Sequence, residues 1–90
     1  MVKDANPKGV SVGSSTTSVL GANPNRGFAD FVNDSDEVIY LAKAATAVLN
    51  QGIRLNAAGG SHTIDRSNPY YGPLSAICAS GSKVLTVTES

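Results

Sequence analysis

The chain is poor in the side chains that small proteins use to stabilise a core or to carry out chemistry. Its 90 residues include three Tyr, two Phe and no Trp, and only 16% are charged. The single cysteine, Cys78, excludes an internal disulfide, and one cysteine with one histidine, His62, excludes a zinc site within one chain. Seven basic residues balance seven acidic ones, so the formal net charge is zero. Nucleic-acid and anionic-membrane partners need a basic excess, and neither is expected.

Long hydrophobic runs and targeting signals are lacking too. The longest largely apolar run, residues 38–49, contains Lys43 and Thr46 and is far shorter than the roughly 20 residues of a membrane span. No apolar stretch follows residues 1–4, so a signal peptide is not expected, and the unpaired Cys78 suits a reducing compartment. A chain of this size buries only about 60% of its unfolded surface, which favours a domain stabilised by neighbouring subunits.

The residues that are present form short apolar segments separated by turn residues, a pattern typical of all-β proteins. Residues 1–16 differ, because Pro7, two glycines and a run of Ser and Thr leave almost nothing to bury. We expect them to be a flexible or extended N-terminal arm, either disordered or ordered only against a neighbouring subunit. Residues 17–90 are then the folded domain.

About seven short antiparallel strands are expected in that domain. They lie at residues 18–20, 27–33, 37–43, 52–55, 61–65, 74–79 and 83–89. Alternation in the last strand points Leu85 and Val87 to one face. The polar residues 33–36 and 80–82 are predicted to be hairpin connections. Residues 44–49 are predicted to be a loop, with a helical turn as the alternative because of their alanines. The predicted fold is an all-β small β-sandwich or barrel.

Groups that could carry catalysis are scarce. His62 lies near Ser61 and Asp65, but neighbouring residues of a strand point to opposite faces and cannot form a triad by themselves. We interpret His62 as a structural or surface histidine, with a symmetric ring of His62 side chains in an oligomer as the alternative. No catalytic, cofactor-binding or metal-binding residue is predicted, and the chain is not expected to be an enzyme.

One segment is rich in oxygen ligands. Residues 33–37, Asn-Asp-Ser-Asp-Glu, include the side chains that calcium prefers, but they lack the glycine and the closing glutamate of an EF-hand loop. Asn, Asp and Ser also dominate tight turns for backbone reasons, and a turn is the preferred interpretation. Asn33 and Ser35 formally match a glycosylation acceptor, yet nothing indicates a secretory pathway.

The strongest sign of an interface is the pair Tyr70 and Tyr71, which lies in a loop between two prolines. Aromatic side chains on a stiffened loop offer a large contact area at little entropic cost, which suits contact with protein or sugar. The alternative is that one or both tyrosines fold back over the end of the sandwich. The candidate partner-contact residues are Tyr70, Tyr71, Asn68, Arg66, Val19 and Leu20.

Several phrases of the sequence resemble those of small β-sandwich virion proteins of tailed bacteriophages. The phrases are Ala22-Asn23-Pro24-Asn25-Arg26, Asn33-Asp34-Ser35-Asp36, Val38-Ile39-Tyr40-Leu41, Gly52-Ile53-Arg54-Leu55 and Ala76-Ile77-Cys78-Ala79-Ser80-Gly81-Ser82-Lys83-Val84-Leu85-Thr86-Val87-Thr88-Glu89. The resemblance covers residues 17–89 and leaves the predicted arm outside it. It implies a virion component made in the host cytoplasm, such as a capsid decoration (cement) protein or a head-fibre module.

A capsid decoration protein is the function that best suits these features, because such a protein is small, present in many copies and stabilised by its neighbours. Its expected partners are the major capsid protein or another virion protein and further copies of itself, with a trimer favoured. The alternative is a carbohydrate- or host-recognition module on a fibre or tail, in which Tyr70, Tyr71, Asn68 and Arg66 would meet a sugar. A third alternative is a small assembly protein unrelated to viruses.

Overall fold

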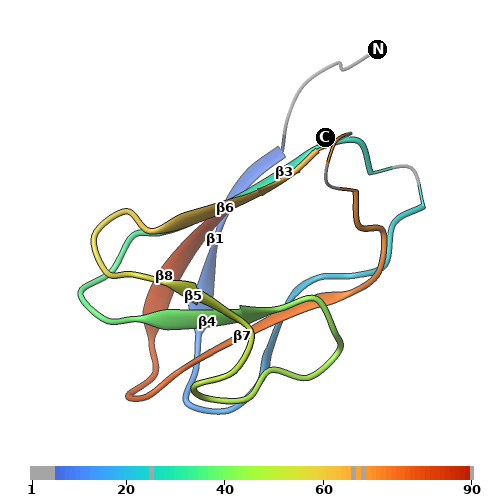
Figure 1. Ribbon diagram of the computed structural model, residues 1–90. Helices are drawn as coiled ribbons and strands as arrows, with labels where there is room; N and C mark the ends of the chain where they lie inside the picture. Colours follow the sequence, from blue (N-terminus) through green and yellow to red (C-terminus); the bar gives the residue numbers. More distant parts are fainter. Residues whose placement is uncertain (1–5, 25, 66, 68, 90) are drawn as a thin grey trace.

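The computed structural model describes residues 6–24, 26–65, 67 and 69–89, and these residues form a small antiparallel β-sandwich (Figure 1). The described strands are β1 (Asn6–Val12), β2 (Thr17–Leu20), β3 (Ala29–Asn33), β4 (Ile39–Ala42), β5 (Ile53–Leu55), β6 (Ser61–Ile64), β7 (Leu74–Cys78) and β8 (Lys83–Glu89). They build two sheets, with the orders β1-β8-β3-β6 and β2-β7-β4-β5. The predicted all-β sandwich is confirmed, and the described residues hold no helix that is long and apolar enough to span a membrane.

The two predicted hairpins are wrong, because both connections cross between the sheets. β3 and β4 lie in different sheets, and so do β7 and β8; β1–β2 and β5–β6 are also joined across the core. These four short connections lie at one end of the sandwich, which we call the arch end. The strand registers show this, since they pair Val12 with Lys83, Asn33 with Leu85 and Val32 with Ser61. Turn residues favour a reversal of the chain, but they do not decide whether the reversal stays within a sheet or crosses to the facing one.

The first described strand corrects the prediction of a separate arm over residues 1–16. β1 pairs with β8 along its whole length, and the side chain of Val12 is fully buried while Val10 packs against the core. The pattern of alternating Val and polar residues in this short segment was obscured by its Pro and Gly residues, and β8 supplies the hydrogen bonds that it needs. The described domain therefore begins at Asn6, and residues 1–5 lie outside the described residues.

The core lies between the sheets and is filled mainly from alternate positions of the strands. Phe31, Ile39, Leu41 and Leu85 are its largest contributors with no exposed surface, and Leu85 and Val87 share a face as predicted. Strand β7 is buried throughout, because the segment after β4 crosses the outer face of its sheet. A 2.9 Å hydrogen bond from Ser75 Oγ to the carbonyl of Ala44 fixes that segment.

This covering segment, residues 43–52, is a loop, which confirms the preferred prediction for residues 44–49 and excludes the helical turn. The backbone N–H of Ala47 donates to Thr16 Oγ1 at 2.8 Å, and Tyr40 donates its hydroxyl hydrogen to Asn50 Oδ1 at 3.0 Å. Val48 and Leu49 of this segment are exposed.

Candidate functional site

The structure separates the two neighbouring tyrosines of the predicted interface. Tyr70 is partly buried against the core, and its hydroxyl donates to the carbonyl oxygen of Pro73 at 2.9 Å. Tyr71 leaves half of its side chain, 50%, exposed to solvent. The fold-back alternative therefore holds for Tyr70, and Tyr71 is the one of the pair that is available to a partner. Arg66 and Asn68 lie outside the described residues.

The loop that carries Tyr71 is held by a buried arginine. The Arg26 side chain has no exposed surface, and its NH1 nitrogen donates to the carbonyl oxygens of Tyr70 at 3.0 Å and Gly72 at 3.1 Å. The carbonyl of Tyr71 itself accepts the backbone N–H of Asn23 at 2.8 Å. Three successive carbonyls of the loop are thus anchored, so the Tyr71 side chain projects from a fixed backbone.

Arg26 also joins this loop to the end of the last strand. Its Nε atom lies 2.8 Å from Glu89 Oε2, and its NH2 nitrogen donates to the carbonyl of Gly21 at 2.7 Å. The planar guanidinium is suited to this task because it presents several donors in fixed directions. Nothing in the composition indicated a structural role for Arg26, although its phrase, residues 22–26, was one of those that carried the resemblance.

Lys43 brings a positive charge to the same region. Its Nζ atom lies 5.8 Å from the centre of the Tyr70 ring, a distance at which a cation is attracted to the face of an aromatic ring. Tyr70 is thus fixed by its hydroxyl hydrogen bond, by the core beneath it and by this cation. It stiffens the loop and offers little surface to a partner.

Val19 and Leu20 are wrong as candidate contact residues. They are 3% and 6% exposed and belong to the core cluster of the sandwich. Strand β2 is paired with β7 and bulges between Ser18 and Leu20, which turns both side chains inward. The exposed large hydrophobic side chains of the described residues are instead Val48, Leu49, Tyr71 and Val84.

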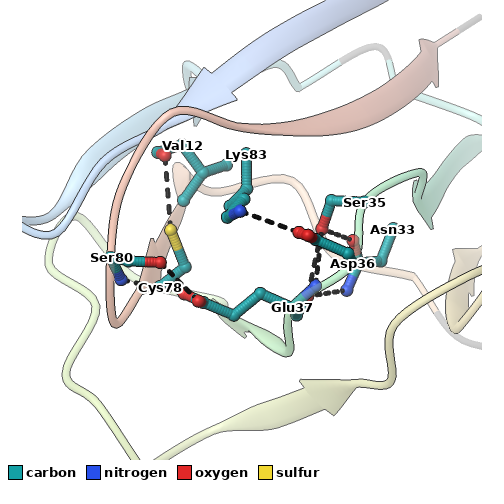
Figure 2. A network of polar contacts seen from close by, with 8 residues as sticks. All are labelled: Val12, Asn33, Ser35, Asp36, Glu37, Cys78, Ser80 and Lys83. Atoms are coloured by element: carbon teal, nitrogen blue, oxygen red, sulfur yellow. Dashed lines mark hydrogen bonds and ion pairs between the residues drawn. The ribbon is translucent and has the colours of Figure 1, made fainter.

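The oxygen-rich residues 33–37 form a network of hydrogen bonds at the arch end (Figure 2). Asn33 is fully buried, and its Nδ2 atom donates to the carbonyls of Glu37 at 2.7 Å and Leu55 at 2.9 Å. Its Oδ1 atom accepts the hydroxyl hydrogen of Ser35 at 2.6 Å. This is the turn that was preferred over calcium binding, and the buried Asn33 side chain is not accessible to glycosylation in the folded chain.

Two acidic side chains of this segment, those of Glu37 and Asp36, have a donor or a cationic partner. Ser80 donates from its backbone N–H, at 2.8 Å, and from its hydroxyl to the Glu37 carboxylate, and these hydrogen bonds lower the pKa of Glu37. Lys83 Nζ lies 2.7 Å from Asp36 Oδ1, which lowers the pKa of Asp36 and raises that of Lys83. Among the described residues, no group of three or more His, Cys, Asp or Glu side chains is placed to hold a metal ion.

His62 lies opposite Phe31 in the pairing of β6 with β3, on the side of the sheet that faces the core. Its Nε2 atom is buried and has no hydrogen-bond partner among the described residues. Burial of the ring, together with the charge of Lys43, lowers the pKa of His62, and Asp30 opposes that shift. His62 was predicted to be a structural or surface histidine, and its ring is partly buried on the core-facing side of the sheet.

The sequence matches no protein-family model, and neither the curated proteins nor the solved structures include a match to this chain.

Proposed function

We propose that this chain is a bacteriophage capsid decoration protein that binds and stabilises the shell as a homo-oligomer. The observation that carries the proposal is the presentation of Tyr71, which is half exposed on a loop whose carbonyls are held by Arg26 and Asn23. Tyrosine on a rigid backbone is a frequent anchor of protein interfaces, because little conformational entropy is lost when it binds.

The resemblance to phage virion proteins supports the proposal in a second way. The quoted phrases include Arg26, which holds the Tyr71 loop, and Asn33 and Ser35, which hold the arch end. These residues stabilise the scaffold and have no catalytic arrangement around them in the described residues. A scaffold that presents one anchored aromatic side chain suits a protein whose task is to pack against other proteins.

The test is sedimentation of the purified chain with shells assembled from the major capsid protein of the same genome. We expect the chain to sediment with the shells, and Tyr71→Ala to weaken binding by roughly tenfold or more, as for an interface anchor. Val84→Ala is the matched control, because Val84 is 43% exposed on β8 and is not part of the loop. Absence of the chain from the shell pellet would contradict the proposal.

A glycan array separates this function from the fibre or tail alternative. Sugar binding uses exposed aromatic platforms, and Tyr70 has its ring against the core. We therefore expect no glycan binding by the wild-type chain. Glycan binding that disappears in Tyr71→Ala, without binding to shells, would replace the decoration role with host recognition.

A further inference from the structure

Strand β1 is attached to the fold along one edge. Its hydrogen-bonded neighbour is β8, in a register that runs from Asn6↔Glu89 to Val12↔Lys83, and it lies at one edge of its sheet, with β6 at the other. Among the side chains of residues 8–12, whose burial is described, Val12 is fully buried and Val10 is partly buried, whereas Lys8 and Ser11 are exposed. Between Lys8 and Val12, β1 therefore contributes two side chains to the core, those of Val10 and Val12.

The rest of the arch end is held together without β1 (Figure 2). The Glu37 carboxylate binds Ser80, and Asp36 binds Lys83, so the connections that follow β3 and β7 are tied to each other. Strand β8 also pairs with β3 from Ala29↔Glu89 to Asn33↔Leu85, which keeps it in the sheet independently of β1.

The contacts that tie β1 to the network are weaker. Figure 2 shows Val12 joined to it through its carbonyl oxygen, which accepts a 3.3 Å hydrogen bond from the Cys78 thiol, a weak donor. At this point the carbonyl of Gly13 also accepts the Cys78 N–H at 3.0 Å and lies 3.5 Å from the Cys78 thiol. Beyond it, Gly13 is held by Thr17 Oγ1, while Ser14 and Ser15 are exposed. Residues 13–16 are thus a polar connection with no core side chain, and extension would break its hydrogen bonds, including the one that Thr16 Oγ1 accepts from the Ala47 N–H at 2.8 Å.

We propose that β1 exchanges between copies of the chain, so that residues 6–12 of one copy pair with β8 of a second copy. The occupant is a second copy because β8 already pairs with this sequence over residues 6–12, with Val10 and Val12 facing the core. Exchange recreates every one of these contacts between copies, which makes it a low-cost route to an oligomer.

The exchange is tested by mixing two singly substituted chains. Ser11 and Val84 are register partners on the exposed face of the β1–β8 pair, so a Ser11→Cys chain can form a disulfide with a Val84→Cys chain when β1 of one lies on β8 of the other. We expect this mixed disulfide under mild oxidation after the chains are mixed at high concentration. An about tenfold rise in monomer concentration should raise the ratio of dimer to monomer about tenfold by mass action.

A matched pair controls for random collisions. Val32 and Ser61 are register partners across β3 and β6, in the same sheet. A Val32→Cys chain mixed with a Ser61→Cys chain should give only the background that each single variant gives alone. A mixed disulfide no more abundant for Ser11 with Val84 than for this pair would overturn the proposal.

A locked variant provides the second measurement. The double variant Ser11→Cys, Val84→Cys, oxidised when dilute, holds β1 on its own β8 and should remain a monomer by light scattering at concentrations where the reduced form associates. Equal association of the locked and reduced forms would show that the copies meet through another surface. The outcome concerns self-association alone, so it leaves the test of shell binding through Tyr71 independent.

Discussion

Asn33 is the side chain on which the arch end depends most, and its replacement gives the sharpest test of the structure. In Asn33→Ala, the buried carbonyl of Leu55 loses the donor that lies 2.9 Å away. The carbonyl of Glu37 loses its 2.7 Å partner as well, but it keeps a 3.0 Å hydrogen bond from Ser35 Oγ. Each of the two carbonyls therefore loses its side-chain donor from residue 33.

The size of the effect follows from these contacts. An unpaired buried carbonyl costs about 1–3 kcal/mol, and a lost hydrogen bond about 1 kcal/mol. We therefore expect Asn33→Ala to lower the free energy of unfolding by about 2–4 kcal/mol. A domain of this length has about 5–13 kcal/mol in total, so the loss is a large share of it. Urea unfolding followed by circular dichroism measures the difference.

Asn33→Asp distinguishes this explanation from simple loss of packing. The new side chain has nearly the same shape, but its carboxylate would face the carbonyls of Glu37 and Leu55, which accept hydrogen bonds and cannot donate them. Burial and the missing donors raise the pKa of the introduced carboxyl above its unfolded value. The deficit relative to wild type is then complete above the folded pKa and shrinks as the pH falls through it.

The matched control is Asn56→Asp, at an exposed residue whose Oδ1 atom accepts a hydrogen bond from Arg54 and would still do so. We expect it to stay within about 0.5 kcal/mol of wild type. The reasoning about Asn33 is refuted if Asn33→Ala costs less than about 1 kcal/mol, or if the deficit of Asn33→Asp does not change with pH.

Three further predictions follow from other contacts. Burial and a nearby lysine lower the pKa of His62, so below about pH 6.5 the unfolded chain takes up a proton that the folded chain does not. The free energy of unfolding should therefore fall as the pH drops through about 6.5. In His62→Gln this part of the pH dependence of urea unfolding should be lost. Arg26→Lys keeps the positive charge but loses the planar set of donors, and it should lower the free energy of unfolding by about 2–4 kcal/mol. It should also accelerate hydrogen exchange at the backbone amide of Asn23, which donates to the Tyr71 carbonyl. Unchanged exchange at Asn23 would argue against the proposed role of Arg26 in holding the loop. Gly60→Ala places a Cβ 2.3 Å from a backbone nitrogen and should destabilise the chain by more than about 2 kcal/mol in thermal unfolding, whereas Gly21→Ala, with nothing within 4 Å, should be nearly neutral.

The candidate site shows where local pattern stops being informative. Tyr70 and Tyr71 are the same residue in adjacent positions, and the sequence alone made both of them candidates. Their different roles depend on Arg26, which binds the Tyr70 carbonyl 44 residues away in the sequence. Arg26 is in turn held by Glu89, 63 residues away from it. Only the folded chain brings these groups together, so the sequence could suggest an aromatic interface but not which ring forms it.

The edge strand β1 is an element that the sequence pattern did not predict. Its segment contains two Val residues that alternate with polar ones, but also Pro7 and Gly9, and a strand with so little to bury has no stability of its own. It forms because β8 offers a free row of backbone donors and acceptors beside the core. That opportunity belongs to the tertiary structure, and no property of residues 6–12 by themselves reveals it.

What the sequence by itself determined is the list of the other strands, from β2 to β8, and the inward faces of many of them. Apolar residues at alternate positions bury one face of a strand whatever its neighbours are, and Gly, Asn and Ser end strands for reasons within the local backbone. Only the tertiary structure decided that the short connections are arches between sheets, that residues 6–12 complete the sandwich and that Val19 and Leu20 are core residues. Each of these depends on which distant strand lies alongside, and that choice is made by the packing of the whole core.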